Sequence, residues 1–352
     1  METRICRLHG QNDLRLETAT FDPPGPGEVL VAPGAGGICG SDLHYLLDGG
    51  IGTIRVREPI ILGHEAAGTV VEIGAGVEGL APGDRVALNP SQPCGTCRFC
   101  TAGQPRHCLS MRFKGSAMLL PHTQGMFRDR MVIAAEQCLK VGPDVPLAAA
   151  ACAEPLAVCL HALNRAEAVA GPLTGKRVLV TGAGPIGALC VALAHWRGAA
   201  EIVVTDLQDR TLEIAAAMGA TRTVNVAHDG AVMAEYEAEK GQFDLVFECS
   251  AAAPAIRTAL ACLRPTGTLA QVGVAGELAI PLNVLVGKEI NFIGSQRFDI
   301  EFAQAVALIA SGTIPVERIV TASFPVEEAA DAFRVANDRT RSVKVQLTFA
   351  GA

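Results

Sequence analysis

The sequence predicts an α/β protein in which a small β-rich domain is followed by a doubly wound parallel sheet. The first observation is size: 352 residues exceed the length at which a single hydrophobic core usually stops growing. The second is a change in sequence pattern after about residue 147, from short, Gly- and Pro-rich stretches to predicted strands that alternate with helix-length segments. That alternation is typical of parallel strands joined by crossover helices.

Short β-branched runs mark the first part of the chain. Residues 68–74 (Gly-Thr-Val-Val-Glu-Ile-Gly) and 84–88 (Asp-Arg-Val-Ala-Leu) are bounded by turn residues, which predicts short strands. An alanine-rich helix is expected over 148–168. It leads into the alternating region, where we expect helices at 187–197 and 210–218 and strands at 177–181, 201–205, 244–249 and 267–273.

The tail from about residue 295 contains an amphipathic helix at 301–310, a second helical stretch near 327–336 and a last strand at 343–347. A final strand needs a sheet to join, and the β-rich first domain is a candidate.

Composition excludes several classes of function. The net charge is −7 and no basic stripe offsets it, which disfavours nucleic acid as a partner. The N-terminus lacks the apolar segment of a signal peptide, and no run of about 18 apolar residues predicts a membrane span. A reducing cytoplasm is the simplest compartment for the 12 cysteines.

Four cysteines lie within fifteen residues, at Cys94, Cys97, Cys100 and Cys108. Thiolates at this spacing can converge on one tetrahedral zinc in a closed structural site. Two disulfides, or cysteines that fill a core, are the alternatives. The spacing favours zinc.

Residues 182–187, Gly-Ala-Gly-Pro-Ile-Gly, lie between a predicted strand and a predicted helix. This glycine pattern lets a backbone approach a pyrophosphate at a helix N-terminus. Asp206 ends the next strand, where a carboxylate can accept hydrogen bonds from a ribose and favours NAD over NADP. Arg210 weakens that preference, because it could pair with Asp206 or receive a 2′-phosphate. We assign cofactor binding to Gly182, Gly184, Pro185, Ile186, Gly187, Asp206, Arg210, Val272 and Gly273.

A second metal site is suggested by Cys39 and His64, which with a nearby carboxylate would give the three protein ligands of a catalytic zinc. On spacing alone, a core histidine and a buried thiol are equally good interpretations.

Residues 63–68 (Gly-His-Glu-Ala-Ala-Gly), followed by Gly74 and Val77, resemble the signature of the zinc-dependent medium-chain alcohol dehydrogenases. The cysteine quartet and the glycine pattern are similar to that family's structural-zinc lobe and cofactor fold. The resemblance implies a GroES-like catalytic domain over 1–150, a Rossmann domain over 151–294, and a segment over 295–352 that returns to the catalytic domain. Pro33-Gly34 departs from the regular strand of relatives and puts that strand's length in question.

Within the family, residues 39–45, 153–157 and 295–298 are similar to the polyol branch of sorbitol dehydrogenases. Residues 89–91, 111–118 and 287–290 resemble the L-idonate 5-dehydrogenases. The resemblance therefore implies oxidation of L-idonate to 5-keto-D-gluconate with NAD or NADP. A sorbitol- or xylitol-type polyol dehydrogenase, or another secondary-alcohol dehydrogenase, is the alternative. A homologue that has lost its catalytic zinc and only binds ligand is the alternative from a different class.

The family resemblance also implies roles for individual residues. It offers Glu65 or Glu154 as the third ligand of the catalytic zinc; we expect Glu65 to bind the metal and Glu154 to hold its water. Asp42 would orient His64, Ser41 would take the alcohol proton, and His44 would pass it outward. Substrate contacts fall on Tyr45, Phe113, Arg297 and Arg112.

Arg112 and Arg297 are the expected discriminators for the carboxylate of a sugar acid, since a guanidinium binds a carboxylate at two points. The apolar run 279–286 resembles an edge segment that relatives use for dimer contacts, which implies a homodimer or homotetramer.

Overall fold

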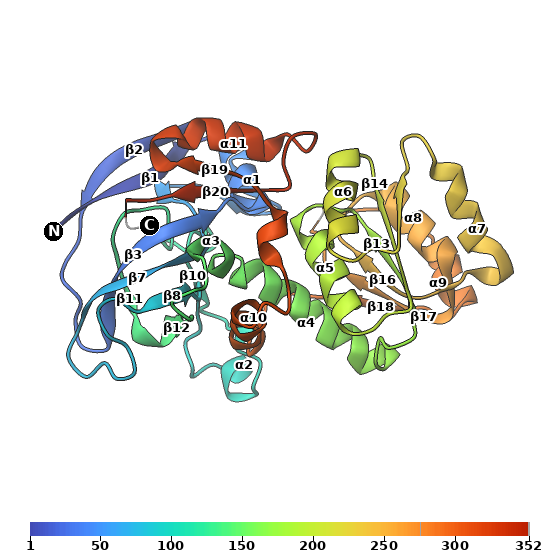
Figure 1. Ribbon diagram of the computed structural model, residues 1–352, viewed down its shortest axis with the longest axis horizontal. Helices are drawn as coiled ribbons and strands as arrows, with labels where there is room; N and C mark the ends of the chain where they lie inside the picture. The colour runs from blue at the N-terminus through green and yellow to red at the C-terminus, as the bar shows by residue number, and fades with distance from the viewer. Residues whose placement is uncertain (275, 351–352) are drawn as a thin grey trace.

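The computed structural model describes residues 1–274 and 276–350. Two bodies lie side by side in Figure 1: one contains the N-terminal strands together with the last elements of the chain, and the other contains a parallel sheet. The helix α4 (Ala153–Ala170) runs from one body to the other.

A seven-stranded sheet forms the frame of the first body, in the order β12-β8-β7-β3-β20-β19 with β11 also paired to β3. The terminal strand β20 (Lys344–Thr348) pairs with β3, where Gln346 lies opposite Gly37. The last strand thus joins the first part of the chain, as its sequence predicts. The other strands of this sheet are β3 (Glu28–Gly37), β7 (Glu65–Ile73), β8 (Arg85–Leu88), β11 (Met131–Ala134), β12 (Cys138–Lys140) and β19 (Val320–Pro325).

Strand β3 continues through Pro33-Gly34 for ten residues. Its register against β7 shifts between Pro33 and Ala35, so one extra residue is accommodated as a bulge. The strand therefore keeps its length, and Cys39 follows two residues after its end.

Smaller elements surround this sheet. The strands β1 (Glu2–Gly10), β2 (Asp13–Thr20) and β6 (Ile60–Ile61) form one sheet. Two further sheets have two strands each: β4 (Gly50–Ile51) with β5 (Ile54–Arg55), and β9 (Ser91–Gln92) with β10 (Arg112–Phe113). The helices here are α1 (Gly40–Asp48), α2 (Arg98–Thr101), α3 (Leu147–Ala150), α10 (Glu301–Ala310) and α11 (Ala329–Asn337).

The second body is a six-stranded parallel sheet in the order β15-β14-β13-β16-β17-β18. This is the Rossmann order, in which the cofactor binds at the carboxyl ends of the strands. Its strands are β13 (Arg177–Thr181), β14 (Glu201–Asp206), β15 (Arg222–Asn225), β16 (Phe243–Glu248), β17 (Leu263–Gln271) and β18 (Asn291–Gly294). Its helices include α5 (Pro185–Trp196), α6 (Asp209–Ala217), α7 (Ala234–Glu237), α8 (Ala253–Cys262) and α9 (Leu282–Gly287).

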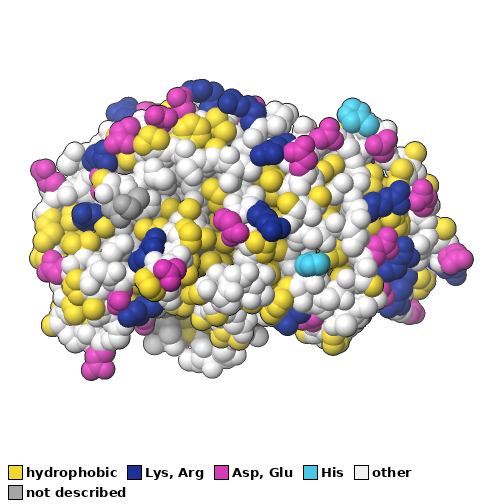
Figure 2. Space-filling model, viewed as in Figure 1, with side chains coloured by type: hydrophobic (Ala, Val, Ile, Leu, Met, Phe, Trp, Pro, Cys, Tyr) yellow, Lys and Arg dark blue, Asp and Glu magenta, His cyan; other side chains and the backbone are white. Residues whose placement is uncertain are grey.

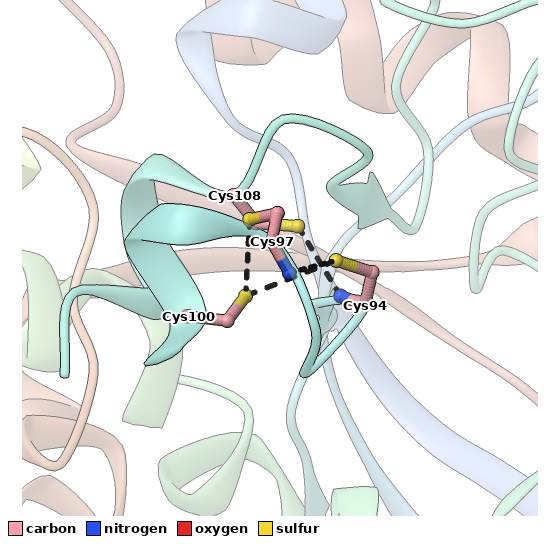
Figure 3. Close-up of side chains that lie close together, drawn as sticks. All are labelled: Cys94, Cys97, Cys100 and Cys108. Atoms are coloured by element: carbon pink, nitrogen blue, oxygen red, sulfur yellow. Dashed lines mark hydrogen bonds between the residues drawn. The ribbon is translucent and has the colours of Figure 1, made fainter. Parts of the chain in front are cut away.

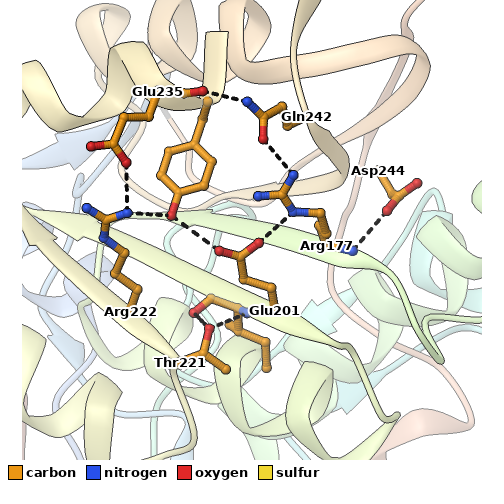
Figure 4. Close-up of polar contacts among 9 residues, drawn as sticks. Arg177, Glu201, Thr221, Arg222, Glu235, Gln242 and Asp244 are labelled. Carbon is orange, nitrogen blue, oxygen red and sulfur yellow. Dashed lines mark hydrogen bonds and ion pairs between the residues drawn. The ribbon is translucent and has the colours of Figure 1, made fainter. Parts of the chain in front are cut away.

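A polar network closes the amino ends of these strands, opposite the cofactor edge (Figure 4). Arg177 begins β13 and pairs with Glu201, the first residue of β14, at 2.5 Å. Tyr236 donates to Glu201 at 3.3 Å and accepts from Arg222 at 3.0 Å. The network ties three strand starts to α7, so we assign it to stability rather than to chemistry.

The helical stretch Leu147–Ala170 is long and apolar enough to span a bilayer by composition alone, which corrects the expectation that no such stretch exists. However, 83% of its apolar window is buried inside the protein, as in a core helix. Figure 2 shows acidic and basic side chains interspersed on the visible face, without a continuous basic stripe.

Candidate active site and metal centres

The four clustered cysteines come together on a small lobe, which we call the cysteine lobe (residues 94–108; Figure 3). Their sulfur atoms all lie within 4.8 Å of one another, including 3.6 Å between Cys97 and Cys100. Backbone N–H groups of Thr96 and Cys97 lower the pKa of Cys94 to about 6. Burial, and hydrogen bonds from Cys97 and Cys108, raise the pKa of Cys100 to about 12. Four converging sulfurs without disulfides fit a closed zinc site.

A second donor set lies between α1 and β7. Cys39 directly precedes α1, and Glu65 opens β7 after His64. One ligand atom from each of the three residues lies within 4.8 Å of the others. Thiolate, imidazole and carboxylate together fit a catalytic zinc with three protein ligands and an open position.

Asp42 fixes the backbone on both sides of this donor set. It is fully buried, and its carboxylate accepts hydrogen bonds from the N–H of Cys39 at 3.0 Å and of Gly63 at 3.2 Å. Its Oδ1 lies 3.9 Å from Nδ1 of His64, within the range of an ion pair. Burial lowers the pKa of His64, but Asp42 and the Cys39 sulfur raise it by more.

Sequence reasoning missed Lys344, which supplies the counter-charge to Glu65. Its Nζ lies 2.8 and 2.7 Å from the two Glu65 oxygens and donates to the carbonyl of Ile38 at 3.1 Å. Their side chains are 3% and 2% exposed. Gly37 makes room for this carboxylate, because a Cβ there would lie 2.1 Å from Glu65 Oε2. Lys344 opens β20, whose residues Lys344 to Leu347 are all buried, but nothing in the local sequence shows that its partner is Glu65.

Glu154 lies in the first turn of α4 and is 7% exposed. Burial raises its pKa to about 7, and the charge of His64 partly offsets this rise. It is not among the three residues whose ligand atoms converge, which agrees with Glu65 as the first candidate for the third ligand.

The expected substrate-side residues separate into two groups. The Phe113 ring lies 5.5 Å from the ring of His64, and the guanidinium of Arg297 lies 4.6 Å from the centre of the Phe113 ring. Buried Tyr45 accepts a hydrogen bond from the N–H of Ala117 at 3.2 Å. Arg112 is exposed, and because neighbouring strand residues point to opposite faces, it does not join Phe113 and Arg297.

The two expected proton-transfer residues lie on α1. Ser41 is partly buried, whereas His44 is 57% exposed and lies 2.7 Å from Asp48. Residues three apart on a helix are neighbours on one face. Ser41 and His44 therefore lie on one face of α1, with His44 exposed to solvent.

The glycine-rich turn has the geometry expected of a dinucleotide loop. Gly184 precedes α5, which begins at Pro185 and continues through Ile186. Gly187 must be glycine, since a Cβ there would lie 1.8 Å from the carbonyl oxygen of Gly182. The N-terminus of α5 is thus open to phosphate.

Asp206 is anchored to this loop. Its oxygens accept hydrogen bonds from the N–H of Ala183 at 2.6 Å and of Leu207 at 2.7 Å. Arg210 pairs instead with Glu213 at 3.0 Å, on the exposed face of α6. The pairing of Arg210 with Asp206 that we considered is therefore not formed.

Glu248, which sequence reasoning also missed, organises the neighbouring loop. It is fully buried at the end of β16, and its carboxylate accepts from the Thr181 hydroxyl at 3.2 Å and the Ser250 N–H at 3.0 Å. Its carbonyl accepts from Val272 at 2.9 Å and Gly273 at 2.8 Å. These contacts hold two expected cofactor residues beside the glycine-rich turn.

Arg339 reaches the same turn from the other body. Its Nη1 lies 3.4 Å from the position that a Cβ on Gly184 would occupy. Nothing in the local sequence around Arg339 predicts this approach.

Comparisons with known proteins agree with this architecture. Residues 25–143 match the alcohol dehydrogenase GroES-like domain, and residues 185–311 match the zinc-binding dehydrogenase domain. The chain is 40% identical to L-idonate 5-dehydrogenase (NAD(P)(+)) of Escherichia coli K12 over 99% of both chains. It is 38% identical to sorbitol dehydrogenase of Gallus gallus, over 97% of this chain and 94% of that one.

The structure superposes on the crystal structure of the E. coli L-idonate 5-dehydrogenase with a TM-score of 0.94, and the match covers 99% of this chain and 99% of that chain. The GroES-like and Rossmann folds expected from the sequence are thereby confirmed. The chain belongs to the zinc-dependent medium-chain alcohol dehydrogenase family and is an oxidoreductase that acts on CH–OH groups.

Proposed function

We propose that the protein oxidises L-idonate to 5-keto-D-gluconate, transferring a hydride to NAD or NADP and releasing a proton. The observation that carries the proposal is the guanidinium of Arg297 beside Phe113, whose ring packs against His64. A fixed positive charge near the metal centre suits a substrate that carries both a secondary alcohol and a carboxylate. The relative named L-idonate 5-dehydrogenase supports the same substrate.

Cys39, His64 and Glu65 would hold the catalytic zinc, which when bound lowers the pKa of the substrate hydroxyl. Asp42 orients His64 through the backbone on either side of the donor set. Ser41 accepts the hydroxyl proton and His44 passes it to solvent.

Other side chains position the reactants. Glu154 holds a water or a substrate hydroxyl at the buried start of α4. Tyr45, Phe113 and Arg297 orient the substrate chain. The glycine-rich turn binds the pyrophosphate, and Asp206 binds the adenosine ribose, which favours NAD.

A second zinc, held by the four cysteines, would brace the lobe at residues 94–108. We further propose a cytoplasmic location, which suits twelve free thiols. A homodimer or homotetramer would cover exposed apolar side chains on and near α9, including Leu282 at 65% and Val286 at 78% exposure.

Oxidation of sorbitol or xylitol is the second candidate, because Arg297 and Tyr45 also match the polyol branch and a sorbitol dehydrogenase is 38% identical. A binding homologue without catalytic zinc is a third. Metal analysis distinguishes this third candidate from the two enzymes. The enzymes should contain two zinc ions per chain, whereas one zinc ion per chain would support the binding homologue.

The deciding experiment is a panel of aldonates and polyols, each assayed with NAD and with NADP. The proposal expects L-idonate to be the preferred substrate. Activity confined to sorbitol and xylitol would overturn it.

A further inference from the structure

The cysteine lobe touches the segment that carries Arg297. The backbone N–H of Arg106, within the lobe, donates to Asp299 Oδ1 at 2.8 Å, and the Arg106 guanidinium pairs with Oδ2 of the same carboxylate. The two side chains are 14% and 13% exposed, so water screens this contact little. Arg106 lies two residues before Cys108, and Asp299 two residues after Arg297.

The backbone of Arg297 has an unfavourable conformation. Its φ is +52°, in the left-handed region, which is unfavourable for a residue with a side chain. Such a conformation persists only where neighbouring contacts enforce it. Phe298 is buried against Phe302 on one side, and the Arg106–Asp299 contact fixes the chain next to it.

The same contact continues into the core. The N–H of Asp299 donates to Glu301 at 3.0 Å, and Glu301 in turn lies 3.0 Å from His161 and accepts from Asn164 at 3.1 Å. His161 and Asn164 belong to α4, the helix that carries Glu154. The lobe is therefore connected through hydrogen bonds to the segment that carries Arg297 and to the helix that carries Glu154.

Between the lobe and the Arg297 segment lies an open cleft of about 550 Å³. Gln104 and His107 line it from the lobe, and Gln296 and Arg297 line it from the opposite wall. Its donors suit a carboxylate.

We propose that the cysteine lobe determines substrate selectivity: through Arg106 and Asp299 it holds Arg297 where the guanidinium meets the carboxylate end of the substrate. Arg106 and Asp299 are positioning residues that act through Arg297. This inference rests on the proposed function.

The test compares Arg106→Gln with Arg98→Gln, a matched change on the same lobe whose guanidinium lies over the Phe99 ring instead. Steady-state rates are measured with L-idonate and with sorbitol, together with zinc content and calorimetric binding of L-idonate to the NADH complex. Arg106→Gln should raise KM and weaken binding for L-idonate about tenfold, the scale of one charge-assisted contact, with sorbitol nearly unaffected. Arg106→Lys should recover part of the loss, and Arg98→Gln should change neither substrate.

Equal losses for both substrates, with zinc retained, would overturn the inference and leave the lobe a purely structural brace. If Arg106→Gln loses the lobe's zinc, Asp299→Asn decides, because it removes the same side-chain contact from outside the lobe. An idonate preference that is present in the unmodified protein but unchanged in these variants refutes this inference alone. No such preference in the unmodified protein refutes the proposed function itself.

Discussion

The buried pair of Lys344 and Glu65 gives a prediction whose size follows from the structure. Replacing Lys344 by Met leaves a carboxylate that is 2% exposed without the ammonium that now contacts both of its oxygens. Removing one partner of a buried ion pair costs about 3–5 kcal/mol, because the remaining charge stays desolvated. We expect metal-free Lys344→Met to lose free energy of unfolding on that scale.

The measurement is urea unfolding of metal-free and zinc-loaded protein, followed by circular dichroism. Lys140→Met is the matched control, since Lys140 pairs with Asp84 at 2.9 Å but is 54% exposed. Surface pairs contribute little, so this control should unfold nearly as the unmodified protein does. Zinc should reduce the loss in free energy of unfolding of Lys344→Met, because a bound cation replaces the lost charge beside Glu65. A deficit no larger than that of the control, or one that zinc leaves unchanged, would refute the reasoning.

Three further predictions concern acid stability, the cofactor and assembly. Burial raises the pKa of Glu301, but hydrogen bonds from His161, the Asp299 N–H and Asn164 lower it to about 2 from 4.5. The ionised carboxylate of Glu301 therefore stabilises the folded state above pH 4.5, and this stabilisation is lost as the pH falls toward 2. In urea unfolding, the difference in free energy of unfolding between the unmodified protein and Glu301→Gln should shrink between pH 4.5 and 2; a constant difference would contradict the prediction. Arg339→Gln should raise KM for NAD several-fold, as loss of a charge-assisted phosphate contact would, with KM for the alcohol unchanged; an unchanged KM for NAD would exclude the contact. Leu282→Glu should shift the protein toward monomer in sedimentation velocity, and an unchanged mass would place the subunit interface elsewhere.

Local patterns in the sequence predicted much of the fold. The strand at 177–181 and the glycine-rich turn after it are encoded by adjacent residues, so the structure reproduces them closely. The strands β15 and β18 were missed, and so were the longer strands β1 and β2, in which charged residues are frequent and the strand pattern is weak.

The site was predictable only where ligands form compact motifs. The cysteine quartet is contiguous, and His64 and Glu65 are adjacent. Lys344 and Arg339 come from the far end of the chain, and only the pairing of β20 with β3 brings Lys344 to Glu65. Arg112 and Phe113 are neighbours in sequence, but the pleat of β10 places them on opposite faces.

The central claim is that the protein recognises the carboxylate of a sugar acid through Arg297, beside the metal centre. The most direct measurement is the ratio of kcat/KM for L-idonate to kcat/KM for sorbitol, in the unmodified protein and in Arg297→Ala and Arg112→Ala. We predict a ratio well above one that falls by about tenfold or more in Arg297→Ala, the cost of one charge-assisted contact, and stays unchanged in Arg112→Ala. A ratio below one, or a ratio that Arg297→Ala does not lower, would contradict the account.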